Sequence, residues 1–187
     1  HGPSGVGKTP LARIIGMGLN CRQGRSSEPC GECGVCTRVL WDAHLAYFEL
    51  NTANVTGIDY MRRIREHFIT GSIDGSENKI FVFDECHRLS VEAQNLLLKE
   101  VEDGFASTYF IFCSTEPDKV LDTLTNRCMP FEFKRIQPPE MRRLLEDVCL
   151  KERVKYRPEI LEWIIERSGG KARNALFLLQ QKVMQLT

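Results

Sequence analysis

The pattern of hydrophobic and polar residues alternates between short apolar runs and longer stretches with helical spacing. The apolar runs are rich in aromatic and β-branched residues, which is typical of strands buried on both faces of a parallel sheet. We expect these strands at residues 45–50, 79–83 and 108–113. Apolar residues three or four positions apart predict helices over 55–68 and 90–101. Strands that alternate with helices predict a doubly wound α/β fold.

The chain changes character after Ile136, where two prolines interrupt it and only helical patterns follow. We expect three helices, over residues 140–151, 158–168 and 172–185. The glycines at 169–170 separate the last two, because glycine commonly ends a helix. The sequence therefore predicts two domains, a sheet domain over residues 1–136 and a small helical lid over residues 137–187.

Composition narrows the class of protein. The 187 residues are 42% hydrophobic, and 25 Lys and Arg balance 25 Asp and Glu, so the chain can bury a core but has no overall positive charge. Contact with DNA would therefore need a local patch or assembly with other subunits. No apolar run reaches the length of a membrane span and no signal peptide is recognisable, so we expect a soluble, cytoplasmic protein. In a reducing compartment, clustered cysteines indicate a metal site before disulfides.

The first motif is GPSGVGKT at residues 2–9, which fits the pattern G-x4-G-K-[ST]. In such a loop, backbone N–H groups surround phosphates, the lysine reaches the outer phosphates and the hydroxyl binds magnesium. The candidate residues for ATP and Mg²⁺ are Gly2, Pro3, Ser4, Gly5, Val6, Gly7, Lys8 and Thr9. An ordinary glycine-rich turn is the alternative. A buried strand normally feeds such a loop, and since only His1 precedes it, we expect the natural N-terminus to be missing.

Two acids, Asp84 and Glu85, follow the second apolar run, at the edge of the sheet where doubly wound folds bind ligands. Magnesium bound to the phosphates of ATP would offset their negative charge. We therefore expect Asp84 to hold the metal ion, and Glu85 to orient or deprotonate the water that attacks ATP. A solvated pair at a helix start is the alternative. Ser114 and Thr115 close the next strand, where a hydroxyl would touch the γ-phosphate or the water, although such residues also form turns. We interpret His87 as a packed or surface imidazole rather than a ligand.

Four of the eight cysteines fall within sixteen residues. Cys21, Cys30, Cys33 and Cys36 have the spacing C-x8-C-x2-C-x2-C. Four thiolates close a tetrahedral structural zinc site and leave no open position for catalysis. Free thiols or a redox pair are the alternatives. The other four cysteines lie in apolar contexts and are expected to be small core residues.

An ordered set of motifs carries a resemblance to a known family. In chain order these are GPSGVGKT, the cysteine cluster, FVFDECH, FCSTEP, TNRC and GGKARNAL. The set resembles the AAA+ clamp-loader ATPases, and among them the gamma/tau subunits of bacterial DNA polymerase III. Asn126 stands where the family usually has a serine, which, with other departures, indicates a divergent bacterial or bacteriophage member.

The resemblance implies roles for three more residues. Thr115 corresponds to sensor 1 and would act with Glu85 in hydrolysis. Arg127 corresponds to the arginine finger, which reaches the ATP of a neighbouring subunit and neutralises developing charge. Arg173 corresponds to sensor 2 and would contact the γ-phosphate from the lid of the same chain. The alternative for Arg127 is a surface ion pair. The alternative for Arg173 is that it has no special role, because basic residues are common in the first turn of such helices.

The resemblance also implies a function. The chain would bind and hydrolyse ATP as a subunit of a sliding-clamp loader, with other loader subunits, the clamp and primer-template DNA as partners. The family's zinc-bearing delta-prime subunit lacks a working phosphate loop, so the intact motifs favour an active ATPase. A silent structural subunit and another AAA+ replication or recombination motor are the alternatives. The family's C-terminal oligomerisation domain is expected to be missing.

Overall fold

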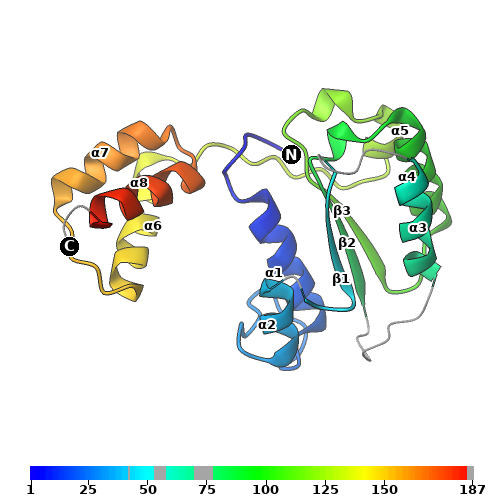
Figure 1. The fold of residues 1–187 in the computed structure, drawn as a ribbon, viewed down its shortest axis with the longest axis horizontal. Helices are drawn as coiled ribbons and strands as arrows, with labels where there is room; N and C mark the ends of the chain where they lie inside the picture. Colours follow the sequence, from blue (N-terminus) through cyan, green and yellow to red (C-terminus); the bar gives the residue numbers. More distant parts are fainter. Residues whose placement is uncertain (42, 53–57, 70–77, 185–187) are drawn as a thin grey trace. The chain divides into compact units, whose positions relative to one another are not determined.

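The computed structural model describes residues 1–41, 43–52, 58–69 and 78–184. The chain divides into two compact units (Figure 1). The first contains His1 and Thr9–Phe131, and the second contains Gly2–Lys8 and Glu132–Thr187. No helix in the described part of the chain is both long enough and apolar enough to span a bilayer.

A parallel sheet forms the centre of the first unit. Its strands are β1 (Tyr47–Asn51), β2 (Lys79–Asp84) and β3 (Thr108–Phe112), in the order β1-β2-β3. The register places Phe48 beside Phe81, and Phe81 beside Phe110. The middle strand β2 is buried from its first residue through Phe83, which explains why its sequence is almost continuously apolar. The predicted strands are confirmed, and their bounds shift by no more than two residues.

Helices cover both faces of this sheet (Figure 1). The helices between Lys8 and Phe131 are α1 (Lys8–Asn20), α2 (Gly34–Leu40), α3 (Ile58–Ile69), α4 (Val91–Asp103) and α5 (Asp122–Thr125), with short 3₁₀ turns η1 (Cys86–Arg88) and η2 (Pro117–Lys119). Successive strand residues point to opposite faces, so Phe81 and Phe83 pack in one core with α3 and α4. Ile80 and Val82 pack in another core with α1 and α2. This is the layered α/β arrangement that the sequence predicts.

Local signals set the ends of α4. The hydroxyl of Ser90 accepts a hydrogen bond from the Ala93 N–H at 3.2 Å and caps the first turn. The helix runs past its expected end at Val101 to Asp103, and Gly104 then takes a positive φ of 63° that ends it. The expected start of the preceding helix, at residues 55–57, lies outside the described residues.

The second unit contains three helices around their own core. They are α6 (Pro138–Lys151), α7 (Pro158–Ser168) and α8 (Ala172–Met184). Leu145, Leu161 and Ile164 are fully buried among them. The first of these helices begins two residues earlier than expected, because proline fits the first helical position. Gly169, with φ of 60°, ends α7 at the residue that the sequence predicts.

Candidate nucleotide and metal sites

The glycine-rich loop leads directly into α1, which begins at Lys8. Gly5 and Gly7 have φ values of 78° and 109°, a backbone region that other residues enter only with strain. The buried ammonium of Lys8 donates to the carbonyl oxygens of Gly2 at 2.8 Å and Pro3 at 2.9 Å. The loop therefore closes around its own lysine, at the end of a helix that favours anions.

The residue after this lysine reaches the edge of the sheet. The hydroxyl of Thr9 donates to Asp84 Oδ2 at 2.9 Å. Asp84 is the last residue of β2, and its Oδ1 accepts the N–H of Glu85 at 3.0 Å. Neighbouring oxygen ligands of octahedral Mg²⁺ lie about 2.9 Å apart, since Mg–O distances are about 2.0–2.1 Å. The structure thus brings together the two predicted magnesium ligands at a separation that suits one ion.

Glu85 takes an uncommon backbone conformation and is held from both neighbouring strands. Its φ of 57° and ψ of 38° are left-handed, which a residue with a side chain adopts only when its surroundings impose it. The hydroxyl of Thr115, beyond β3, donates to Glu85 Oε2 at 2.9 Å. The hydroxyl of Thr52, beyond β1, lies 2.7 Å from the carbonyl oxygen of Glu85 and 2.9 Å from that of Asp84.

A buried histidine completes this edge of the sheet. His87 is buried, so of the packed and the surface positions that the sequence allowed, the packed one is correct. Its Nδ1 lies 3.1 Å from Ser114 Oγ. Its Nε2 lies 3.3 Å from a carboxylate oxygen of Glu116. Sequence reasoning missed the roles of Thr52 and Glu116. The available signal was their place just after a strand end, the same signal that identified Thr115.

The two candidate arginines are placed differently. Arg127 follows α5, donates to the Thr123 carbonyl oxygen at 2.8 Å and forms an ion pair with Glu102. In this chain it therefore contacts its own unit. Arg173 lies in the first turn of α8, and its backbone N–H donates to the Gly5 carbonyl oxygen at 3.2 Å, within the second unit.

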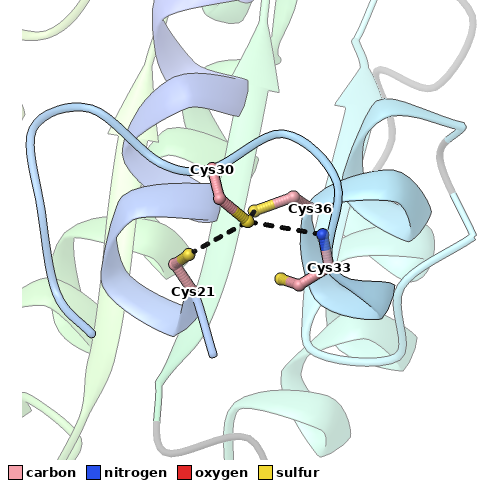
Figure 2. A group of neighbouring side chains, drawn as sticks. All are labelled: Cys21, Cys30, Cys33 and Cys36. Carbon is pink, nitrogen blue, oxygen red and sulfur yellow. Dashed lines mark hydrogen bonds between the residues drawn. The ribbon is translucent and has the colours of Figure 1, made fainter. Parts of the chain in front are cut away.

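The predicted cysteine ligands come together in one cluster (Figure 2). The sulfurs of Cys21, Cys30, Cys33 and Cys36 all lie within 4.8 Å of one another. Cys30 Sγ is 3.6 Å from Cys21 Sγ and 3.9 Å from Cys36 Sγ. A tetrahedral zinc ion with Zn–S bonds of about 2.3 Å separates its sulfurs by roughly 3.8 Å. The cluster therefore fits Zn²⁺ in both size and donor chemistry.

Electrostatics within the cluster also favours a cation. A hydrogen bond from the Cys36 backbone lowers the pKa of Cys33 to about 6, and one from the Cys30 backbone lowers the pKa of Cys21. Burial, by contrast, raises the pKa of Cys36 to about 12. Four adjacent thiolates need a positive charge among them, and a bound zinc ion supplies it.

The other cysteines match their expected role in part. Cys86 and Cys113 are buried in the first unit and Cys149 is buried in the second, whereas Cys128 is half-buried. Burial raises the pKa of Cys86 to about 12, so it is a poor nucleophile.

Together, the sheet covered on both faces, the glycine-rich loop that opens α1 and the Thr9–Asp84 contact define a P-loop nucleotide-binding fold. The chain belongs to the family described as "DNA polymerase III, delta subunit", whose model matches residues 1–137. This match and the relatives described next confirm the resemblance that the motifs carry.

The curated relatives are polymerase subunits. The chain is 36% identical to DNA polymerase III subunit gamma/tau of Mycobacterium tuberculosis, 33% to subunit tau of Bacillus subtilis and 30% to subunit tau of Escherichia coli, each over 182 residues. These alignments cover 96–97% of this chain and 28–32% of the relatives. The chain thus spans about a third of the length of these three relatives.

A solved structure shares the fold. The RuvB Holliday junction branch migration motor of Thermotoga maritima matches with a TM-score of 0.63 and 18% identity, over 93% of this chain and 49% of that one. This likeness supports the predicted α/β fold class, and at this identity it concerns the fold alone.

Proposed function

We propose that this chain is the ATP-binding and ATP-hydrolysing part of a sliding-clamp loader subunit. ATP turnover would be coupled to loading of the clamp onto primed DNA during replication. The family and its relatives, all DNA polymerase III subunits, support the setting. The arrangement around Asp84 and Glu85 supports the chemistry.

The single observation that carries the proposal is the Glu85 carboxylate fixed by Thr115, one residue from the Thr9–Asp84 pair. A carboxylate held in this way can orient water and take up its proton. Thr9 and Asp84 supply the oxygen ligands that Mg²⁺ prefers. A bound magnesium ion would neutralise charge on the transferred phosphoryl group. A silent structural subunit has no need for this combination.

Other residues are given roles that suit their positions. Lys8 and the backbone of residues 2–9 would hold the phosphates. Arg173 would report the γ-phosphate to the lid, and its backbone contact with Gly5 supports a link between loop and lid. Arg127 would leave Glu102 and act on the ATP of a neighbouring subunit.

The zinc module would be structural. Cys21 follows the last residue of α1, and Cys36 lies in α2, so a shared zinc ion would tie these helices together. We further propose a sheet domain over residues 1–136 and a lid over residues 137–187. Partners would be other loader subunits, the sliding clamp and primer-template DNA, in the cytoplasm.

The test is steady-state ATP hydrolysis by the complete natural protein, with clamp and primed DNA present. Glu85→Gln should slow hydrolysis by about 100-fold or more while ATP binding is retained, because it removes only the base. Asp103→Asn, an exposed acid at the end of α4, is the matched control and should keep the full rate. A wild-type protein that binds ATP without turnover, or an unaffected Glu85→Gln variant, would identify a silent subunit instead.

A further inference from the structure

The environment of His87 suggests a role beyond packing. The residue lies in η1, two positions after Glu85, and its side chain is only 4% exposed. Three polar groups surround the ring. Nδ1 lies 3.1 Å from Ser114 Oγ and 3.6 Å from Glu85 Oε2, and Nε2 lies 3.3 Å from Glu116 Oε1. The ring thus lies between Glu85 and the segment that follows β3.

The partners of this ring determine what each nitrogen does. Lys119 pairs with Glu116 and lowers the pKa of that carboxyl, so Glu116 is ionised at neutral pH and can only accept a hydrogen bond. Nε2 lies 3.3 Å from this carboxylate and faces an acceptor, so it is the nitrogen that carries the ring proton. The hydroxyl of Ser114 accepts the Glu116 N–H at 3.0 Å, which leaves its own proton free to point at Nδ1. The segment that follows β3 thus lies against both ring nitrogens.

The fixed ring limits where Glu85 can move. Glu85 Oε2 accepts the Thr115 hydroxyl on one side and faces His87 Nδ1 on the other. Because Nδ1 accepts the Ser114 hydroxyl, it has no proton to give Glu85 Oε2. His87 therefore acts on this oxygen through the Ser114–Glu116 segment, which carries Thr115. Displacement of the Ser114–Glu116 segment would move Thr115 away from the Glu85 carboxylate. A buried ring held by two other residues is a more rigid support than a solvated side chain.

We propose that His87 is a positioning residue for the carboxylate of Glu85, which it keeps in register with the Ser114–Glu116 segment. This inference rests on the proposed hydrolytic role of Glu85. His87 would act through Ser114, Thr115 and Glu85 and would touch neither the nucleotide nor the attacking water. Its loss should reduce the fraction of molecules in which Glu85 is correctly oriented, without changing the residues that hold ATP. The effect should therefore appear in kcat and leave the KM for ATP unchanged.

Three substitutions test the role of each nitrogen. His87→Phe keeps the ring volume but removes both nitrogens, and His87→Gln retains a polar group only at the Nε2 position. Both should lower kcat for ATP about tenfold, because misplacement of a catalytic group by a fraction of an ångström has effects of this size. His87→Asn provides an amide at the Nδ1 position, where it can donate or accept, and should stay within about threefold of wild type. The assays use the complete natural protein.

A second buried histidine provides the matched control. His44 precedes β1, at the opposite edge of the parallel sheet from Glu85, and its Nδ1 accepts the Ala46 N–H at 3.1 Å. His44→Phe removes a buried imidazole to the same extent and should leave kcat unchanged. Melting temperatures of all variants separate loss of folding from loss of activity.

A double variant decides whether His87 acts through Glu85. If it does, Glu85→Gln with His87→Phe hydrolyses ATP no more slowly than Glu85→Gln alone. Multiplied losses would overturn the proposal, as would a normal kcat in folded His87→Phe, or a KM that rises in step with the fall in kcat. If Glu85→Gln slows hydrolysis and His87→Phe does not, only this inference fails. If neither slows it, the proposed function fails as well.

Discussion

Replacement of Thr52 by valine tests how the strained backbone of Glu85 is maintained. Thr52 is only 2% exposed, and valine has its shape without its hydroxyl. The variant therefore removes one group, the Oγ1 that lies 2.9 Å from the Asp84 carbonyl oxygen and 2.7 Å from that of Glu85. The hydroxyl has one proton, so these two contacts share a single hydrogen bond.

The structure allows the cost to be worked out. Asp84 O still accepts the Thr52 N–H at 3.0 Å, and Glu85 O still accepts the Arg88 N–H at 2.9 Å. Neither carbonyl is left without a donor, so the penalty for an unsatisfied group does not apply. The loss is that of one net hydrogen bond, about 1 kcal/mol of the free energy of unfolding.

The same loss should affect turnover. A left-handed backbone costs a side-chain-bearing residue roughly 1–2 kcal/mol, and Thr52 is one of the groups that hold Glu85 in it. Removal of about 1 kcal/mol from this support should lower the rate of ATP hydrolysis about fivefold, since 1.4 kcal/mol corresponds to a factor of ten.

The assay compares urea unfolding and ATP hydrolysis of Thr52→Val, Thr52→Ser and wild type. Serine keeps the hydroxyl, so it should restore most of the rate even though it loses a buried methyl group. The reasoning is refuted if valine unfolds and hydrolyses ATP like wild type. It is equally refuted if serine is as slow as valine, because the hydroxyl would then be irrelevant.

Two further predictions concern the zinc module and the arginine finger. The natural protein should contain one zinc ion per chain by metal analysis, and Cys30→Ala should lose it and melt at a lower temperature, while Cys149→Ala, buried in the second unit, keeps the metal. Arg127→Ala should slow hydrolysis by about 1,000-fold in the assembled complex, and Glu102→Gln, which removes only the ion-pair partner, should not. Equal losses in the two variants would indicate a purely structural ion pair.

The strands of the sheet could be predicted from the sequence because the pattern of apolar residues that marks them is strong and local. The run from Lys79 to Asp84 is buried on both faces, so every position but the last is excluded from water and the pattern is unambiguous. The ends of helices were less predictable, since they depend on caps. The early start of α6 at Pro138 and the late end of α4 at Asp103 are both set by residues just outside the apolar pattern.

The candidate site was predictable where ligand chemistry demands particular residue types. Lys8, Thr9, Asp84 and the four cysteines were predicted in this way, because phosphate, magnesium and zinc each require specific donors. The structure brings Thr9 to Asp84 and gathers the four cysteines. Residues that support these donors follow no such rule. Thr52 is recognisable only when the strand register places the end of β1 beside that of β2. The contacts of His87 likewise depend on the segment after β3.

The order of the strands explains how the candidate site around Glu85 is built. The strand β2 lies between β1 and β3, so its last residues have a neighbour on each side. The backbone of Glu85 is held by Thr52 from the β1 side. Its carboxylate is held from the β3 side by Thr115, which lies on the segment that His87 contacts through Ser114. A shift of either flanking strand end by a fraction of an ångström would therefore move Glu85. The rate of hydrolysis should respond to changes at both flanks, even where the residues changed never touch the nucleotide.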